Sequence, residues 1–99
     1  MASADPNFRP KSQLERKVVF EFYAPLSSKV ELAGDFNSWK PSDTPLKKDA
    51  QGKWKTEILL KPGRYEYRFW VDGTWQNDQC PGEMVPNPFG TWNCVIKIQ

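Results

Sequence analysis

The chain has 99 residues, of which 14 are lysine or arginine and 12 are aspartate or glutamate, so its net charge is +2. Charges of both signs are mixed along the sequence, and we therefore expect neither nucleic acid nor a membrane surface as a partner. The chain contains no histidine, which excludes catalysis and metal binding that depend on an imidazole.

The length fits one domain with a small core, preceded by a polar segment. Residues 1–16 combine Pro6 and Pro10 with charged and small polar side chains, and they predict an N-terminal tail or linker. Residues 17–99 form the predicted domain. The first ten residues hold no apolar segment of the kind that signal peptides contain, so nothing argues for secretion.

Two strands are predicted first, at Lys17–Tyr23 and Lys29–Ala33, because apolar residues alternate with other residues in both. The residues expected to face the core are Val18, Phe20, Phe22, Val30 and Leu32. Those expected on the outer faces are Val19, Glu21, Tyr23, Lys29, Glu31 and Ala33.

A turn is predicted at Gly34–Trp39. Glycine reaches backbone angles closed to other residues, and aspartate, asparagine and serine stabilise turns by bonding to nearby backbone. Phe36 is expected to pack into the core, whereas Trp39 ends the turn near solvent. Trp75 follows a second turn at 71–74. Two tryptophans at turns predict either a flat exposed aromatic platform or two buried rim residues.

The clearest strand patterns lie at Lys53–Leu60 and Arg64–Val71. In the first, Trp54 is in phase with Ile58, so its indole is expected in the core. In the second, the residues of the expected core face are Tyr65, Tyr67, Phe69 and Val71. The opposite face carries Arg64, Glu66, Arg68 and Trp70.

The rest of the chain is predicted to hold turns, one long loop and a last strand. Asp72–Gly73 is a favoured two-residue hairpin turn. Gln76–Pro88 is the long loop, because its prolines and glycine disfavour a long strand, and such loops often bind ligands. A final strand is predicted over 93–98. Short strands with frequent turns indicate an all-β fold, an antiparallel β-sandwich of immunoglobulin-like shape.

The two cysteines fall in different settings, Cys80 in the long loop and Cys94 on the inward phase of the last strand. Two cysteines alone do not make a disulfide framework. We favour two free thiols in a reducing compartment, which agrees with a cytoplasmic location, and expect folding to need neither. A bond from the loop to the strand is the alternative.

Three motifs in this order resemble family 48 carbohydrate-binding modules: Gly34–Trp39, Tyr65–Trp75 and Phe89–Asn93. That family includes the glycogen-binding domain of the AMP-activated protein kinase β subunit and N-terminal modules of starch branching and debranching enzymes. The similarity runs from about Lys17 to Ile98. It implies a β-sandwich that binds α-1,4-linked glucan (glycogen, starch, maltooligosaccharides or cyclodextrin) without catalysis.

The resemblance also implies which aromatic residues bind the sugar. Trp39 and Trp75 match two tryptophans that stack on glucose rings. Phe89 stands where the family has a leucine that inserts between or beneath glucose rings, so the apolar side chain is kept but is larger and flat.

Three polar residues complete the carbohydrate site that the resemblance implies. Arg68 matches a lysine that hydrogen-bonds the glucan, and arginine changes the geometry of the donors. Asn93 matches an asparagine that bonds sugar hydroxyls, and Thr91 a nearby polar contact. Aromatic faces suit the apolar face of glucose and polar side chains suit its hydroxyl groups, so such a site needs no cofactor and no metal.

Two further tryptophans, Trp70 and Trp92, fall within these motifs. Trp70 shares the face of Arg68, and it either contacts the ligand or lies on the sheet surface. Trp92 is expected to pack under the loop, outside the site.

A second function competes with glucan binding. The module could support a protein interaction, attached to a kinase or a glycoside hydrolase domain, with sugar binding lost. The retention of Trp39, Arg68, Trp75 and Asn93 favours glucan binding, because a scaffold has no need for that set. We expect no enzyme, because no catalytic residue and no acid–base pair is recognisable in the sequence.

Overall fold

The structure is a computed structural model that describes residues 14–77 and 79–99. Residues 1–13 of the predicted tail lie outside the described residues. The elements in chain order are β1 (Arg16–Tyr23), β2 (Val30–Gly34), η2 (Asp35–Asn37), η3 (Pro41–Asp43), β3 (Lys47–Lys48), β4 (Lys53–Leu60), β5 (Gly63–Val71), β6 (Thr74–Gln76), β7 (Met84–Pro86) and β8 (Trp92–Ile98).

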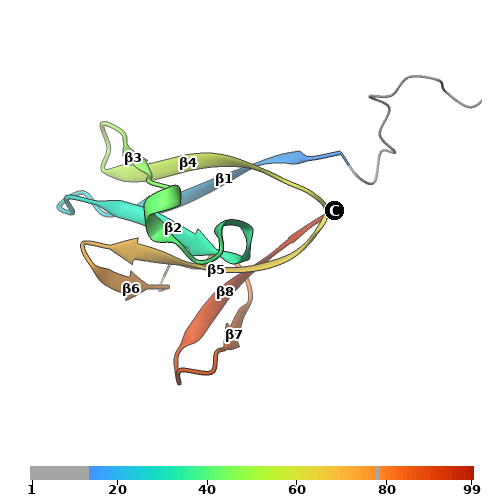
Figure 1. Cartoon of the computed structure of the whole chain (residues 1–99). Coiled ribbons are helices and arrows are strands. Elements are labelled where there is room, and N and C mark those ends of the chain that lie inside the picture. The colour runs from blue at the N-terminus through green and yellow to red at the C-terminus, as the bar shows by residue number, and fades with distance from the viewer. Residues whose placement is uncertain (1–13, 78) are drawn as a thin grey trace, which may run out of the picture.

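Two antiparallel sheets pack face to face as a β-sandwich (Figure 1). One sheet has the order β1-β4-β3, and the other has the order β2-β5-β8-β7, with β6 also pairing with β5. The described residues form no α-helix, and none of their helical turns is long and apolar enough to cross a membrane. The predicted all-β sandwich is confirmed.

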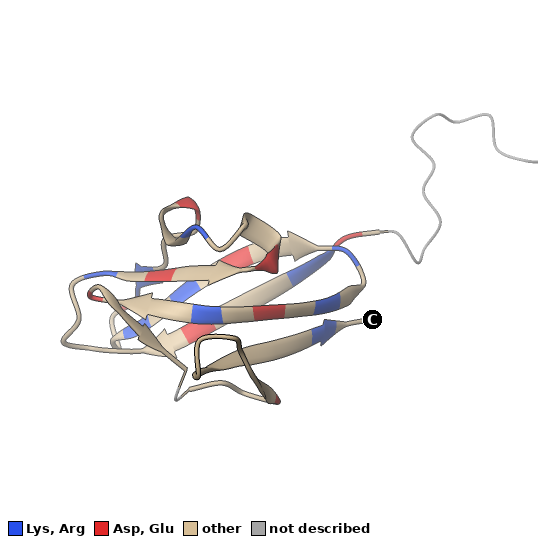
Figure 2. Cartoon of the chain, turned by 60° about the horizontal axis from the view of Figure 1, so that its bottom comes forward, with Lys and Arg blue, Asp and Glu red and all other residues tan. Residues whose placement is uncertain are grey.

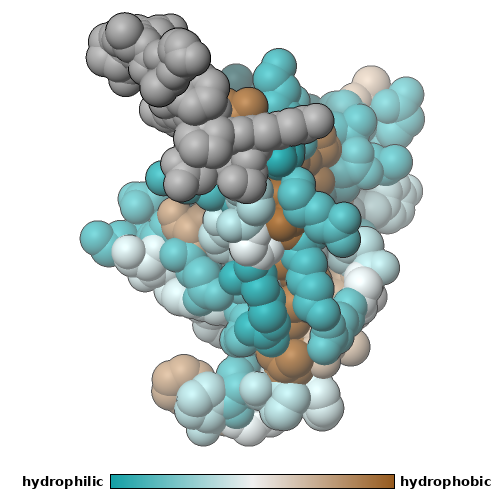
Figure 3. Space-filling view, turned by 90° about the vertical axis from the view of Figure 1, so that its right-hand side faces the viewer, coloured by the Kyte–Doolittle hydropathy of each residue, from teal (hydrophilic) through white to brown (hydrophobic). Residues whose placement is uncertain are grey.

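The core lies between the two sheets, where apolar side chains form a narrow band between hydrophilic surfaces (Figure 3). The predicted inward faces of β1, β4 and β5 are confirmed by the buried residues, which include Phe20, Phe22, Trp54, Leu60, Tyr67, Phe69 and Val71. Trp54 is a core residue, as expected, and its indole nitrogen donates to the Ala24 carbonyl at 2.8 Å. Phe36 packs against this core, with its ring centroid 5.6 Å from that of Phe20.

The outer face of β2 is buried, which contradicts the prediction for Glu31 and Ala33. These residues are 5% and 0% exposed. Their partners across the β2–β5 pair are Trp70 and Arg68, and paired side chains share one face of a sheet. Large side chains from β5 therefore cover the smaller strand. The Glu31 carboxylate is paired with Lys29, at 3.6 Å.

The hairpin turn at Asp72 and Gly73 forms as predicted. Both residues have positive φ, 48° and 82°, as a tight turn between right-twisted strands requires. The Asp72 carboxylate accepts the backbone N–H groups of Ser28 and Lys29, each at 2.9 Å. Hydrogen bonding from Lys29 and then Ser28 holds the pKa of Asp72 below its ordinary value.

Part of the long loop is ordered as β7, a three-residue edge strand that pairs with β8. The prediction that no long strand forms here is correct. Pro86 is accommodated because it lies in an edge strand, where a missing N–H can face away from the sheet.

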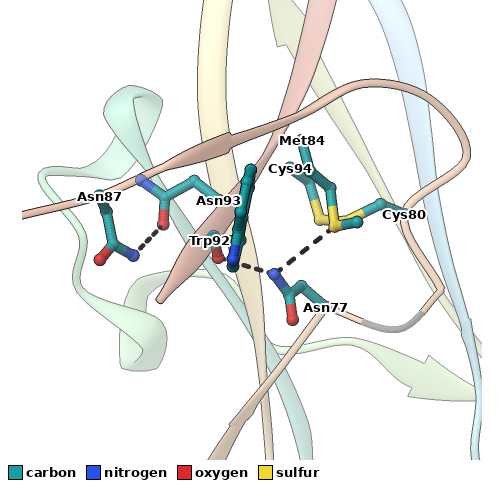
Figure 4. Close-up of a disulfide and its surroundings, with 7 residues drawn as sticks. All are labelled: Asn77, Cys80, Met84, Asn87, Trp92, Asn93 and Cys94. Carbon is teal, nitrogen blue, oxygen red and sulfur yellow. Dashed lines mark hydrogen bonds between the residues drawn. A yellow bond between two sulfur atoms is a disulfide. The ribbon is translucent and has the colours of Figure 1, made fainter. Parts of the chain in front are cut away.

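The two cysteines form a disulfide (Figure 4), so the expectation of free thiols is wrong. The Cα atoms of Cys80 and Cys94 lie 5.6 Å apart, within the usual range for a disulfide. Cys94 is fully buried in the core, and Cys80 packs against the same core from the loop. The loop returns to the start of β8 because Asn77 donates to the Trp92 carbonyl at 2.7 Å.

We expect reduction of this disulfide to lower the free energy of unfolding by about 2–3 kcal/mol, since it frees a loop of roughly 15 residues in the unfolded chain. Melting temperatures with and without dithiothreitol test this. A Cys80→Ser variant should melt low under both conditions. An unchanged melting temperature after verified reduction would instead support the expectation that folding needs neither cysteine.

A second prediction concerns Asp72 and acid. Because its folded-state pKa is lowered, its stabilising effect is complete above the ordinary value of 3.8 and is lost as pH falls through the lowered value. The wild type should therefore melt above Asp72→Asn at neutral pH, and this difference should shrink below pH 3.8. Asp43→Asn, an exposed aspartate in η3, is the control. A difference that does not depend on pH would contradict the assignment.

Candidate functional site

A pocket of about 390 Å³ lies on the outer face of the sheet that contains β5. Its lining residues come from η2 and the turn after it, β5, β6, the β7–β8 turn and β8: Asp35, Trp39, Glu66, Arg68, Trp75, Asn87, Pro88, Phe89 and Asn93. Along the outer face of β5, charges of opposite sign alternate (Figure 2). The pocket therefore combines aromatic rings with both acidic and basic groups.

Arg68 lies at a junction along β5, where the neighbouring strand changes. Before it, Tyr67 pairs with Cys94 of β8, and after it, Phe69 pairs with Gln76 of β6. The opposite edge of β5 is occupied by β2, so β6 and β8 follow one another along the same edge. Pocket residues that are far apart in the sequence are brought together at this junction.

The turn after β2 is closed by Gly34 and Asn37. A Cβ atom at Gly34 would lie 2.7 Å from the Glu66 carbonyl oxygen and 2.8 Å from the Phe36 ring, so only glycine fits. The Asn37 side chain accepts the Gly34 N–H at 3.0 Å and donates to the Leu32 carbonyl at 2.9 Å. These contacts fix the path of the chain as it leaves the sheet.

The backbone that carries Trp39 into the pocket has an unusual conformation. Ser38 and Trp39 both have φ near +60°, a region that residues other than glycine seldom occupy. The Trp39 N–H donates to the Gly34 carbonyl at 3.0 Å, which helps to hold this conformation. Strained backbone of this kind is concentrated at functional sites.

The Asp35 carboxylate connects this turn to β5. One oxygen accepts the Trp39 indole N–H at 3.0 Å, and the other accepts the Glu66 backbone N–H at 2.8 Å. Glu66 is the residue just beyond the β2–β5 pairing, which ends at Gly34 and Tyr67. The carboxylate therefore satisfies a strand-edge donor and orients the indole at the same time.

The two site tryptophans are half-buried and share one surface, as expected, but they do not form a flat platform. The rings of Trp39 and Trp75 are inclined by 71°, with centroids 6.4 Å apart. Trp70 is the cross-strand partner of Trp75, and their ring centroids lie 4.6 Å apart, edge to face. Trp70 is not among the lining residues, so it packs beside Trp75 on the same face of the sheet. Trp92 is 50% exposed and lies outside the lining, rather than packing under the loop.

The Arg68 guanidinium lies beside Trp75, with its central carbon 5.5 Å from the indole centroid. It donates one hydrogen bond to the Thr91 hydroxyl at 3.3 Å. Within the part of the chain that the structure describes, its buried Nε has no partner. Burial lowers the pKa of Arg68, but an arginine remains charged at neutral pH. The donors available to a ligand are therefore those on its terminal nitrogens that do not bond Thr91, whereas Nε is enclosed by the protein.

Asn87 organises the β7–β8 turn, and the sequence prediction did not include it. Its side-chain oxygen accepts the backbone N–H groups of Phe89 and Thr91, at 3.0 and 3.1 Å, and the Thr91 hydroxyl at 3.0 Å. Phe89 is presented to solvent at the tip, 89% exposed. The Asn-Pro pair at 87–88, which is typical of turns, was the available sequence signal.

Asn93 is almost fully buried, at 7% exposure. Its amide nitrogen donates to Glu66 at 3.0 Å, and its amide oxygen accepts from Asn87 at 2.9 Å. Glu66 also accepts a bond from Arg64 at 2.8 Å. Hydrogen bonding from Asn93, and then from Arg64, holds the pKa of the Glu66 carboxyl below its ordinary value.

The structure brings the six predicted site residues together around one pocket. Most of them line it, and Thr91 lies beside it through its bonds to Arg68 and Asn87. The prediction missed Asp35, Glu66, Asn87 and Pro88. No cluster of cysteine, aspartate and glutamate side chains among residues 14–77 and 79–99 is arranged to hold a metal ion.

Residues 16–99 match the sequence model of a family described as the glycogen recognition site of AMP-activated protein kinase. The chain belongs to this family. It is 37% identical over 71 residues to 5'-AMP-activated protein kinase subunit beta-1 of Rattus norvegicus, covering 71% of this chain and 24% of that protein. It is 35% identical over 68 residues to FLOURY ENDOSPERM 6, chloroplastic, of Oryza sativa subsp. japonica, covering 69% of this chain and 13% of that protein.

The solved structure of apo pullulanase from Paenibacillus barengoltzii shares the fold, with a TM-score of 0.52 at 20% identity. The match covers 91% of this chain and 15% of the pullulanase chain. The predicted resemblance to family 48 carbohydrate-binding modules is thus confirmed. This domain spans less than a quarter of the length of each of the relatives described here.

Removal of the Asp35 carboxylate should destabilise the site and move the Trp39 indole. We expect Asp35→Ala to lower the free energy of unfolding by about 1–3 kcal/mol, because two donors lose a charged acceptor. Urea denaturation followed by tryptophan fluorescence measures both effects. Asp43→Ala, an exposed aspartate in the neighbouring η3, should change stability by less than about 0.5 kcal/mol. Equal stabilities of the two variants would contradict the role of Asp35.

Proposed function

We propose that this domain binds α-1,4-linked glucan without catalysis, as glycogen, starch, maltooligosaccharide or cyclodextrin. The observation that carries this proposal is the pairing of two half-buried indoles, Trp39 and Trp75, with the guanidinium of Arg68 in one pocket. Membership of a family described as a glycogen recognition site supports it.

The inclination of the indoles suits a curved ligand. Each aromatic face can pack on the C–H face of one glucose unit, and a 71° angle between the rings requires successive units to turn. An α-1,4-linked chain turns in this way, whereas a β-1,4-linked chain is a flat ribbon. Phe89 at the exposed tip adds a third apolar contact between or beneath the sugar rings.

The polar groups are proposed to bind the hydroxylated edge of the sugar. Arg68 supplies donors, and the family resemblance assigns contacts to Thr91 and Asn93 as well. Because the ligand is neutral, added salt should change the affinity little.

The state of the pocket carboxylates supports binding without catalysis. A glycosidase needs one carboxyl group with a raised pKa as general acid. The pKa of Glu66 is lowered instead, and both oxygens of Asp35 already accept hydrogen bonds within the protein. The site needs no cofactor for this function.

A protein interaction is the second candidate, because one relative is a kinase subunit and the pullulanase structure contains the same fold as a small part of its chain. Attachment to a kinase or glycoside hydrolase domain, with sugar binding lost, would explain why the chain has this fold, but it would not explain the residues that line the pocket.

The cytoplasmic location also stays a prediction, since FLOURY ENDOSPERM 6 and the Arabidopsis thaliana protein PTST are both named as chloroplastic.

We expect β-cyclodextrin and maltoheptaose to bind with dissociation constants between about micromolar and about millimolar, because a shallow pocket desolvates little surface. Trp39→Ala and Trp75→Ala should each weaken binding most, since each removes a stacking face. Titration calorimetry and co-sedimentation with glycogen measure these effects.

Trp92→Ala is the matched control, because it removes an exposed indole that lies outside the pocket, at the start of β8. It should change the dissociation constant by no more than about twofold, which is less than the effect of losing a typical hydrogen bond. If the folded wild type fails to bind any α-glucan, the protein-interaction function takes its place. If the Trp39→Ala, Trp75→Ala double variant binds like the wild type, the site assignment is wrong.

A further inference from the structure

We propose that the Glu66 carboxylate is a glucan-contacting residue, the acceptor for sugar hydroxyl groups, and that Asn93 is a positioning residue that holds it. This inference rests on the proposed glucan binding. It differs from the family resemblance, which assigns direct sugar contact to the asparagine and no role to residue 66.

Asn93 offers a ligand little exposed surface. It is 7% exposed, and each end of its amide already has a protein partner, Glu66 for the nitrogen and Asn87 for the oxygen. The amide keeps one further donor and one further acceptor position, but Asn93 lines the pocket with only a small exposed surface. Asn93 therefore acts mainly as a link between Glu66 on β5 and Asn87 in the β7–β8 turn.

The Glu66 carboxylate is more accessible to a ligand than the Asn93 amide. Its side chain is 27% exposed and lines the pocket beside Arg68. One oxygen accepts from Asn93 at 3.0 Å and the other accepts from Arg64 at 2.8 Å. A carboxylate has about four acceptor positions, so roughly two remain for a ligand.

The charges around Glu66 favour its ionised form. The neighbouring charged groups are Arg64 and Arg68 on β5 and Asp35 on η2. On β8, the facing residues are neutral: Val95, the cross-strand partner of Glu66, and Asn93, which donates to it. An ionised carboxylate only accepts, and hydrogen bonds to charged groups are stronger than neutral ones. Glucose hydroxyls can donate to Glu66 and accept from Arg68, which lies two residues along the same face, roughly 7 Å away.

The first test compares variants on β-cyclodextrin by calorimetry. Glu66→Gln keeps the size and a neutral acceptor, and it should weaken binding about three- to tenfold. Arg64→Gln removes only the neighbouring cation and should stay within about twofold, which separates the carboxylate from its ion pair. If the wild type binds and Glu66→Gln binds equally well, the inference fails while the proposed function stands; if the wild type does not bind, the proposed function itself fails.

The second test removes the hydroxyl donors from the ligand instead. Fully methylated β-cyclodextrin can accept but not donate hydrogen bonds. Methylation should therefore cost the wild type several-fold more affinity than it costs Glu66→Gln. If methylation weakens both proteins by the same factor, Glu66 acts only through structure and the inference is overturned.

The third test separates contact from positioning through pH. The wild-type affinity should be constant above the ordinary glutamate value of 4.5 and fall as pH drops through the lowered pKa, whereas that of Glu66→Gln should stay flat. In Asn93→Ala the fall should begin at higher pH, because its hydrogen bond contributes most to the lowered value. An Asn93→Ala profile with unchanged midpoint would contradict the positioning role.

Discussion

The Asp35 carboxylate is the interaction on which the pocket depends, because it joins a strained turn to the edge of β5. Without this carboxylate, no hydrogen bond would orient the Trp39 indole, which stands on a backbone in the left-handed region. Bonds from one carboxylate to the indole and to the Glu66 backbone set the distance between Trp39 and the residues of β5. Gly34 makes this approach possible, since any side chain there would collide with the Glu66 carbonyl.

The opposite wall of the pocket is held by a different set of contacts. The chain between β6 and β8 is tied down by the Asn77–Trp92 hydrogen bond, the Cys80–Cys94 disulfide and a hydrogen bond from Val95 to the Glu83 carbonyl. Asn87 then shapes the tip that presents Phe89. A small core cannot by itself order a loop of this length, so covalent and polar contacts supply what apolar burial does not.

Between these walls, a polar chain runs from Arg64 through Glu66 and Asn93 to Asn87. Because each of these side chains hydrogen-bonds the next, the polar atoms on this side of the pocket are paired, including both ends of the Asn93 amide. The indoles supply the apolar contacts of the same pocket. A neutral ligand with one apolar face and many hydroxyl groups matches that division.

The sequence by itself determined the β-sandwich and the core position of Trp54, because period-two alternation fixes which side chains share a face. The six residues that gather at the pocket were indicated by the resemblance of three short motifs to a known family, not by alternation. Lys53–Leu60 forms with the predicted bounds, and Arg64–Val71 differs by one residue. Only the tertiary structure decided the burial of Glu31 and Ala33, the disulfide, and the contacts that Asp35, Glu66 and Asn87 make. The burial, the disulfide and the contacts of Glu66 depend on partners in other strands or loops, and alternation within one strand carries no information about which side chains those segments place opposite it. The contacts of Asn87 are local, but they arise within a turn, where alternation does not apply.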